Sequence, residues 1–395
     1  MKESNGRVDS SKAHNVVILD ESRRNIYYPE REVFGNFQRF NVTILTSFEG
    51  IMRKLKSRVR VVAPRTINLL PVNLISYNFI FVRAIQKLLK TYEPSVVVTY
   101  ELYSTLSYQI TRVKKQLKFI QAVICYDTIP MNTALWGIFL PTRFFALSVI
   151  DGADIFIALN NRIKDALMSS GVQKEKIHTI YPGIFIEDYS IHNIERKSNG
   201  LNFKFLFVGA LRLNKGIKTL LSVFISLNKE GYGNIELVIA GSGPLEQEVK
   251  EASRENKNIH FAGYVSEDKK KQLLYESDAF VYPSEDVFVF SKIKRWEEQS
   301  ALSVCEAMAA GLPIIVSDSG GLPEIIGSKE AVFRQGCIEC LKEKILELYH
   351  SPELRVRLAL YNAERSRKLF DVRVYSECLE SIFLDSMKYS EPNKI

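Results

Sequence analysis

The stretch EQSALSVCEAMAAGLPIIVSDSGGLPEIIG, residues 298–327, indicates the fold most directly. It opens on two glutamates eight positions apart, Glu298 and Glu306, in a run of small and apolar residues that favours a helix over 298–310. An apolar strand led by proline follows at 313–317, and a glycine turn then leads into another helix. Helix, strand, glycine turn and helix in this order favour a parallel sheet covered by helices.

Both ends of this stretch suit an extended anionic ligand. In a helix over 298–310, the two glutamates lie about 12 Å apart along the axis and roughly 80° apart around it. They can then hold two hydroxyl-bearing parts of one ligand, such as the two sugars of a nucleotide sugar. After the strand, Gly320 and Gly321 precede a helix that begins near Pro323. This order places backbone N–H groups and a helix N-terminus at the carboxyl edge of a sheet, where α/β proteins bind anions. The stretch therefore predicts a nucleotide-sugar site.

The same stretch resembles the signature of retaining glycosyltransferases of family 4. Four other segments, at 154–189, 205–221, 236–249 and 259–284, match motifs of that family in the family's order. One of them reads FLFVGALRLNKGIKTLL and another ELVIAGSGPLEQEV. The first 150 residues match only faintly. The resemblance implies the GT-B fold, an α/β architecture of two facing Rossmann-like domains, each a doubly wound parallel sheet, with an interdomain cleft that holds the site.

The length and the pattern of the chain agree with two domains. At 395 residues the chain is long for one core, and short apolar runs alternate with amphipathic segments. We expect an acceptor-binding domain over 1–190, a nucleotide-sugar-binding domain over 191–370 and a helix over 371–395 that crosses back to the first domain. A polar segment at 190–202 is the expected linker. The expected strands are 15–19, 41–46, 59–63, 95–100, 119–126, 154–159 and 178–181, then 204–208, 236–240, 260–262, 279–282 and 313–317.

The loop GALRLNKG, residues 209–216, follows a strand and starts a helix. Gly209 permits close approach of a ligand, the helix N-terminus adds a positive dipole and Lys215 adds a full charge, which suits a diphosphate leaving group. By resemblance, Lys215 is the family's diphosphate-binding lysine. Ala210 stands where the family has arginine, and Arg212 is a candidate to replace it, with a solvated loop residue as the alternative. Asp-x-Asp occurs nowhere in the chain. We therefore expect no metal ion, and no cofactor besides the donor substrate.

The resemblance also assigns roles to the two glutamates. Glu306 matches the residue that accepts hydrogen bonds from the ribose, and its place among small and apolar residues favours a ligand partner. Glu298 matches the residue that faces the transferred sugar. The loop before Glu298 is longer than in the family, so Glu285 and Glu297 are alternatives for that role.

Other candidate residues follow strands in both domains. Tyr264 and Val265 resemble the segment whose backbone reads the nucleobase, with an ordinary turn as the alternative. In the first domain, Tyr126 and Asp127 stand where relatives have His-Asp, and a tyrosine hydroxyl can also hydrogen-bond a donor sugar. The pair Arg23-Arg24 is a candidate for an acceptor phosphate, with solvated charge as the alternative.

The charge of the chain bears on its partners. Residues 1–190 carry 25 Lys+Arg against 16 Asp+Glu, net +9, whereas residues 191–395 carry 28 against 29, net −1. The basic first half suits an anionic membrane surface or a phosphate-bearing acceptor, with solubilising charge as the alternative. Aromatic residues are not interleaved with the basic ones in a stacking pattern, so we expect no nucleic-acid partner.

Hydropathy and cysteines bear on location. The N-terminus is polar, without the apolar core of a signal peptide, and no run of about 20 apolar residues is uninterrupted. The stretches 51–65 and 134–150 are basic and apolar; we expect burial, with a bilayer surface as the alternative. The motif Cys337-x-x-Cys340 has no second pair for zinc, and we expect all five cysteines to be reduced. These features predict a cytoplasmic protein, free or peripheral on the cytoplasmic face of the membrane.

Taken together, these features predict a retaining glycosyltransferase that moves a hexose from a UDP- or GDP-sugar to a hydroxyl of a glycan or lipid-linked acceptor. The resemblance implies a front-face mechanism, in which the diphosphate leaves from the side on which the acceptor attacks. Two alternatives stay open. One is a GT-B epimerase or hydrolase that needs no acceptor, and the other is a decayed transferase that serves as a basic membrane-binding protein.

Overall fold

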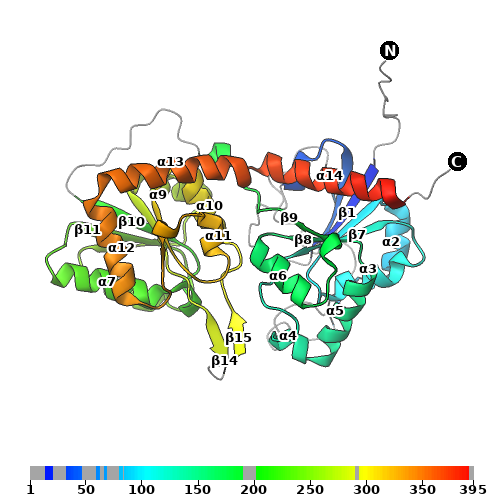
Figure 1. Ribbon diagram of the computed structural model, residues 1–395, viewed down its shortest axis with the longest axis horizontal. Coiled ribbons are helices and arrows are strands. Elements are labelled where there is room, and N and C mark those ends of the chain that lie inside the picture. Colours follow the sequence, from blue (N-terminus) through cyan, green and yellow to red (C-terminus); the bar gives the residue numbers. More distant parts are fainter. Residues whose placement is uncertain are drawn as a thin grey trace, which may run out of the picture.

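The computed structural model describes residues 14–20, 33–46, 59–62, 66–68, 80–82, 84–189, 202–289 and 293–390. They form two α/β domains that lie side by side, each built on a parallel sheet (Figure 1). The chain therefore has the expected architecture of two Rossmann-like domains. The Arg23-Arg24 pair and all of the expected linker except Asn202 lie outside the described residues.

The first sheet is parallel throughout. Parallel strands are connected by crossover helices, and these helices cover both faces of the sheet, which explains why its strands are apolar. Its interior strand β7 is buried at every position. The strands lie in the order β3 (Val59–Val62), β2 (Phe40–Thr46), β1 (His14–Asp20), β6 (Val96–Tyr100), β7 (Ile120–Cys125), β8 (Ile155–Ala158) and β9 (Ile177–Thr179). The helices of this domain are α2 (Ile85–Tyr92), α3 (Thr105–Lys114), α4 (Leu135–Ile138), α5 (Leu140–Gly152) and α6 (Asn161–Ser169), and β4 (Thr66–Asn68) pairs with β5 (Ile80–Val82).

The second sheet is also parallel, and its strands β13 and β16 are buried at every position. The strands lie in the order β12 (Ile259–Gly263), β11 (Ile235–Ala240), β10 (Phe203–Val208), β13 (Ala279–Tyr282), β16 (Ile314–Ser317) and β17 (Val332–Phe333). The helices are α7 (Ile217–Lys229), α8 (Glu246–Glu255), α9 (Glu267–Glu276), α10 (Leu302–Ala309), α11 (Leu322–Ile326), α12 (Ile338–His350) and α13 (Pro352–Leu369). An antiparallel hairpin of β14 (Val287–Val289) and β15 (Ile293–Trp296) projects from this domain (Figure 1).

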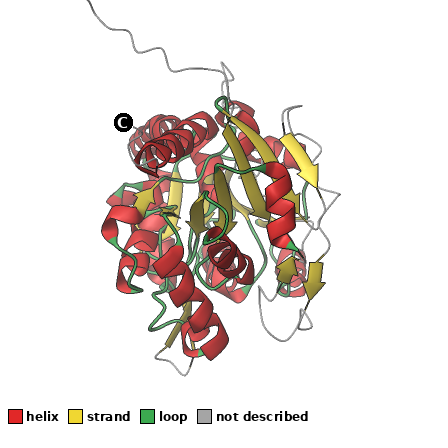
Figure 2. Cartoon of the chain, turned by 90° about the vertical axis from the view of Figure 1, so that its right-hand side faces the viewer, coloured by secondary structure: helices red, strands yellow, loops and turns green. Residues whose placement is uncertain are grey.

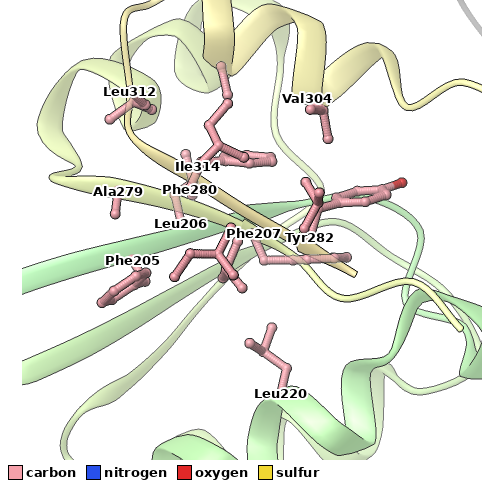
Figure 3. Close-up of a cluster of buried hydrophobic side chains, with 14 of the residues drawn as sticks. Phe205, Leu206, Phe207, Leu220, Ala279, Phe280, Tyr282, Val304, Leu312 and Ile314 are labelled. Atoms are coloured by element: carbon pink, nitrogen blue, oxygen red, sulfur yellow. The ribbon is translucent and has the colours of Figure 1, made fainter. Parts of the chain in front are cut away.

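Branched and aromatic side chains fill the core on both faces of the second sheet. Leu220 of α7 packs on one face and Val304 of α10 on the other (Figure 3). Within the sheet the rings of Phe207 and Tyr282 stack with their centroids 5.6 Å apart. Tyr282 lies at the edge of the labelled cluster, and its hydroxyl points away from the other side chains (Figure 3). This ring therefore connects the core to the carboxyl edge of the sheet.

The last helix, α14 (Val372–Ser390), follows α13 and packs on the first domain (Figure 1). Its side chains Tyr375, Leu379 and Phe383 are buried in the core of that domain. The Glu380 carboxylate accepts hydrogen bonds from two backbone N–H groups of the first domain, both at 2.8 Å. The last described helix thus lies beside the domain that contains β1, the first described strand, as Figure 2 shows from the side.

The secondary structure agrees with most of the sequence-based expectations. Every expected strand overlaps an observed one, and the expected apolar face of the helix after Gly216 is buried. The strands that the sequence pattern did not indicate are short: β4, β5, β14, β15 and β17.

The expected burial of residues 134–150 is wrong for the outer face of this segment. Ala146 and Val149 of α5 are buried in the first core, but the opposite face is apolar as well, and no element in the described part of the chain covers it. Of the other stretch, 51–65, the structure describes only β3, an edge strand whose residues are half-buried or exposed. The exposed large side chains of α4 and α5 are Ile138, Phe139, Leu140, Phe144 and Leu147.

The expectation that every cysteine is reduced is wrong for one pair. Cys337 and Cys340 form a disulfide at the N-terminus of α12, where a spacing of three residues brings two side chains onto one face. Cys125, Cys305 and Cys378 are free. Disulfides are rare in reducing compartments, so the pair removes one argument for a cytoplasmic location. That location stays a prediction.

Candidate active site

The carboxyl edge of the second sheet gathers loops from three neighbouring strands, β10, β13 and β16. Gly209 directly follows β10, and Gly216 starts α7 with a φ of 65°. A Cβ atom on Gly216 would lie 1.8 Å from the carbonyl oxygen of Pro283, so only glycine fits there. The loop 209–216 is therefore pressed against the end of β13.

Lys215 lies in this loop with its ammonium group in a buried, anionic setting. Its Nζ is 2.5 Å from Glu298 Oε2, and it lies 5.3 Å from the ring centroid of Tyr282 and 4.8 Å from that of Trp296. Burial alone would lower the pKa of Lys215, but the Glu298 carboxylate and the Tyr282 hydroxyl together outweigh burial and raise that pKa above its usual value. The site therefore holds a fully charged lysine between two aromatic rings.

Glu298 does not lie in a helix, contrary to the expectation for 298–310, because α10 begins only at Leu302. Its backbone instead pairs with the turn that follows β16: Gly321 N donates to Glu298 O at 2.8 Å, and Glu298 N donates to Ser319 Oγ at 3.2 Å. Gly320 has a φ of 51°, and a Cβ atom there would lie 2.0 Å from Glu298 O. Residue 298 thus lies outside α10, and its carboxylate reaches Lys215.

The turn at Gly320 and Gly321 has internal partners in this structure. The N–H of Gly321 is used by Glu298 O, and the Cβ position of Gly321 lies 2.6 Å from the side-chain nitrogen of Asn160, which belongs to the first domain. The turn therefore packs against Glu298 and Asn160. Its expected contact with an anion stays a prediction.

Glu306 is buried in α10, where it accepts two hydrogen bonds. Lys270 Nζ lies 2.8 Å from Glu306 Oε1, and the Tyr189 hydroxyl donates to the same oxygen at 2.9 Å. Burial raises the pKa of Glu306, and Lys270 opposes that shift. No sequence pattern indicates these two partners, because residues 189, 270 and 306 come from separate elements that only the fold brings together.

The remaining candidates of the second domain differ in exposure. Tyr264, after β12, is 83% exposed, whereas Val265 is half-buried against the core. Arg212 is exposed, and no side chain in the described part of the chain pairs with it. These positions leave Tyr264 and Arg212 accessible to a ligand.

The two alternatives to Glu298 are paired elsewhere. Glu285 accepts a hydrogen bond from Thr219 at 2.5 Å. Glu297 is buried and binds Arg162 of the first domain and Lys294 of the hairpin. Of the three glutamates, Glu298 is therefore the one that the structure brings to Lys215.

In the first domain, Tyr126 and Asp127 follow β7, and the structure adds a third group that the sequence reasoning missed. Glu101 directly follows β6 with a φ of 62°, and its carboxylate accepts from Tyr126 N at 2.9 Å. Burial, together with the charge of Asp127, raises the pKa of Glu101 to about 8. The sequence signal that could have identified Glu101 is a charged residue placed directly after the buried strand β6. Glu101 and Asp127 line a small internal cavity together with Ser170.

Comparison with known proteins places these features in a family. The model of the glycosyltransferase family 4 matches residues 37–188, and the model of the glycosyl transferases group 1 matches residues 191–365. The chain belongs to the family 4 glycosyltransferases. The two models meet between the two domains: the first covers the first sheet except β1, and the second covers the whole second sheet.

Individual relatives agree with this assignment. The chain is 26% identical to the capsular polysaccharide biosynthesis glycosyltransferase CapM of Staphylococcus aureus, over 63% of this chain and 67% of that protein. It is 30% identical to spore coat protein SA of Bacillus subtilis, over 53% of this chain and 59% of that protein. The chain thus spans about two thirds or less of these two relatives.

Solved structures share the fold at low identity. Anabaena HepE in complex with UDP and glucose has a TM-score of 0.71 and 16% identity, over 94% of this chain and all of that one. WaaG, a glycosyltransferase involved in lipopolysaccharide biosynthesis, has a TM-score of 0.65 and 17% identity, over 93% of this chain and 99% of that one. The GT-B fold of this glycosyltransferase is therefore established.

Proposed function

We propose that this glycosyltransferase moves a hexose from a UDP- or GDP-sugar to a hydroxyl of a glycan or lipid-linked acceptor, with retention of configuration and without a divalent metal ion. The observation that carries the proposal is Lys215, a charged lysine at the carboxyl edge of the second sheet whose side chain is 14% exposed. Solved HepE structures hold UDP and UDP-glucose, which supports a nucleotide-sugar donor of the UDP type.

In this proposal, Lys215 neutralises the leaving diphosphate. Its present partner is the Glu298 carboxylate, which also accepts a hydrogen bond from Ser284 Oγ at 2.6 Å. A donor phosphate then takes the place of Glu298 beside Lys215. The Glu298 carboxylate keeps its hydrogen bond from Ser284 and can accept a second one from a sugar hydroxyl. The N-terminus of α7, which begins two residues after Lys215, adds a positive dipole on the same side.

The proton of the acceptor needs a base. In the front-face mechanism, the acceptor oxygen bonds to the anomeric carbon as the bond from that carbon to the phosphate oxygen breaks. The leaving phosphate oxygen then takes the proton of the acceptor hydroxyl, so charge and atoms balance without a side-chain nucleophile. The charge on that oxygen is what Lys215 stabilises, as electrostatic catalysis requires.

A donor screen tests the proposal. UDP- and GDP-sugars are compared for thermal stabilisation of the protein, since a ligand that binds the folded state raises the midpoint. Transfer is then assayed with and without EDTA, and the anomeric configuration of the product is read by NMR. Full activity in EDTA with a retained configuration supports the proposal. Donor consumption at the full rate without an acceptor favours the epimerase or hydrolase alternative instead.

We also propose that the first domain binds the surface of a membrane that contains anionic lipid. Ile138, Phe139, Leu140, Phe144 and Leu147 are exposed and form an apolar patch on α4, α5 and the residue between them. The two helices lie in the lower part of the first domain in Figure 1. Patches of large exposed side chains mark partner surfaces. Among the described residues, no helix meets the length and hydropathy that a membrane crossing requires. A peripheral contact is therefore the form of association that we propose.

The charges near the patch favour anionic headgroups over a second protein. Between residues 102 and 150 the only acidic residue is Asp127, against five Lys and Arg residues. Arg143 is exposed within the patch, and Arg112, Lys115 and Lys118 are exposed at or just beyond the end of the neighbouring α3. Apolar side chains that enter the interface, with basic ones at headgroup level, are typical of peripheral membrane proteins.

Vesicle binding tests the membrane proposal. The double variant Leu140→Glu with Phe144→Glu is compared with Val356→Glu with Leu360→Glu, which alters equally exposed apolar residues on α13. We expect the first pair to lower partitioning onto phosphatidylglycerol-containing vesicles roughly tenfold or more, and the second to leave it unchanged. Equal binding by both variants, or a wild-type dimer that the first pair dissociates, would contradict a membrane partner.

A further inference from the structure

One short segment of the first domain, Asn160–Arg162, makes several of the contacts that join the two domains. Asn160 is fully buried, and its side-chain nitrogen donates to Gln299 O at 2.7 Å. The same side chain packs against Gly321, where a side chain in place of glycine would clash with it. The backbone N–H of Asn161 donates to the Glu324 carboxylate at 2.9 Å. Both partners, 299 and 324, flank the glycine turn of the second domain.

Arg162 adds a charged contact to this segment. Its Nε lies 2.8 Å from Glu297 Oε1 and its Nη2 lies 3.1 Å from Glu297 Oε2, so the guanidinium grips the carboxylate with two parallel hydrogen bonds. Lys294 Nζ binds the second oxygen at 2.6 Å and also reaches Asp286 at 2.7 Å. Glu297 is 1% exposed, and a carboxylate so buried is tolerated only when it is paired.

Arg162 and Lys294 keep Glu297 ionised. Burial opposes the charge, but the hydrogen bonds from Arg162 and Lys294 outweigh it and lower the pKa of Glu297. Removal of Arg162 would leave the carboxylate with Lys294 as its one cationic partner. A buried ion pair that loses one member destabilises its surroundings more than an exposed pair does.

The position of Glu297 in the chain connects this ion pair to the donor site. Its neighbours on either side, Trp296 and Glu298, both contact the ammonium of Lys215. Residues 296–298 lie between the end of the hairpin strand β15 and the start of α10. Of these three residues, Glu297 is the one whose side chain binds the first domain. A shift of Glu297 therefore displaces both groups that hold Lys215.

We propose that Arg162 is a positioning residue for the donor site, acting through Glu297 to hold Trp296 and Glu298 against Lys215. The catalytic geometry of the second domain then depends on its contact with the first, so the site is complete only when the two domains are in register. The role in turnover rests on the proposed function. The role in positioning Trp296 does not.

Four variants test this role. Arg162→Ala removes the pair, Arg162→Lys keeps the charge without the two-pronged grip, and Glu297→Gln removes the charge from the other side. Lys271→Ala is the control, because it breaks a different ion pair, with Asp188 at 3.2 Å, that has no connection to the hairpin. Transfer rates and UDP binding by calorimetry are measured for each variant.

We expect Arg162→Ala and Glu297→Gln to lower kcat about tenfold or more, because misplacement of a catalytic group by a small distance is costly. The Kd for UDP should change less than threefold, since roughly the same groups remain in the second domain. Arg162→Lys should fall between wild type and Arg162→Ala, and Lys271→Ala should match wild type. If Arg162→Ala and Lys271→Ala keep the same kcat, the positioning role is refuted.

Fluorescence gives a second readout that does not need activity. Trp296 is one of two tryptophans in the chain, so Trp136→Phe leaves it as the sole reporter. In that background, Arg162→Ala should make Trp296 measurably more accessible to acrylamide, and Lys271→Ala should not. If no donor is turned over at all, the proposed function fails, and the quenching result alone decides the positioning role. Unchanged quenching in Arg162→Ala and Arg162→Lys would overturn it.

Discussion

The two domains share one architecture and differ in what their loops carry. Each is a parallel sheet of buried apolar strands with helices on both faces. The carboxyl edge of the second sheet holds a charged lysine beside Glu298, whereas the same edge of the first holds Glu101 next to Asp127. The first domain also has an exposed apolar patch on its outer helices. The comparison teaches that the strands decide the fold, and the loops at one edge decide the chemistry.

The largest expected effect is at Lys215. If the second domain neutralises the leaving group, Lys215→Ala should lower kcat at least tenfold, and about a hundredfold by analogy with the loss of one electrostatic contact in other enzymes. Initial transfer rates at saturating donor measure this. Lys218→Ala is the control, because Lys218 is an exposed lysine one turn further along that pairs with Glu248. A Lys215→Ala variant with wild-type rates would break the comparison between the domains.

Glu306 tests whether the second domain also binds the nucleotide through its buried carboxylate. Glu306→Gln keeps the shape of the side chain but removes the charge, and we expect the Kd for the donor to rise about tenfold, the cost of weakening a hydrogen bond to a charged group. Calorimetry with the donor measures the change. Glu267→Gln is the matched control, since Glu267 also pairs with Lys270 but is far more exposed. Equal Kd values for the two variants would remove Glu306 from the site.

Trp296 tests the contribution of the hairpin. Its ring faces the Lys215 ammonium, and Trp296→Ala should lower kcat/KM about fivefold, in the range of one cation–π contact. Phe288→Ala, at an exposed position on the same hairpin, should have no effect on kcat/KM. Steady-state kinetics distinguish the two. A larger loss for Phe288→Ala would show that the hairpin tip, rather than its base, matters to transfer.

Glu101 tests the corresponding edge of the first domain through pH. Its pKa is raised to about 8, so between its ordinary value and pH 8 the folded state binds a proton that the unfolded state has lost. The contribution of Glu101 to stability is therefore complete at low pH and is lost as pH rises to about 8. Glu101→Gln, which stays neutral, should gain in Tm relative to wild type between pH 5 and pH 9. A Tm difference that is constant over this range would contradict a protonated Glu101.

Much of the fold could be predicted from the sequence, because local signals determine it. Apolar runs marked every strand of both sheets except the two-residue β17, and Gly216 marked the start of α7. The position of Lys215 after β10 followed from the same pattern. These features depend on neighbours in the chain, so one sequence suffices to find them.

The rest depends on contacts between distant segments. Glu298 was expected in a helix, but its backbone packs against Gly320 and Gly321 instead. The residues next to Glu298 in the sequence do not indicate that contact. The pairing of Glu306 with Lys270 and that of Glu297 with Arg162 likewise join separate elements. The outer face of α5 was expected to be buried because it is apolar, and composition alone does not show which apolar faces find a partner.

A crystal structure with a bound UDP- or GDP-sugar, grown with EDTA present, tests the central claim most directly. The account predicts a diphosphate oxygen about 2.7–3 Å from Lys215 Nζ, the distance of a charge-assisted hydrogen bond, with the Glu298 carboxylate turned from the lysine toward the sugar. A diphosphate bound away from the carboxyl edge of the second sheet, or a donor that binds only when a divalent metal ion is added, would contradict it.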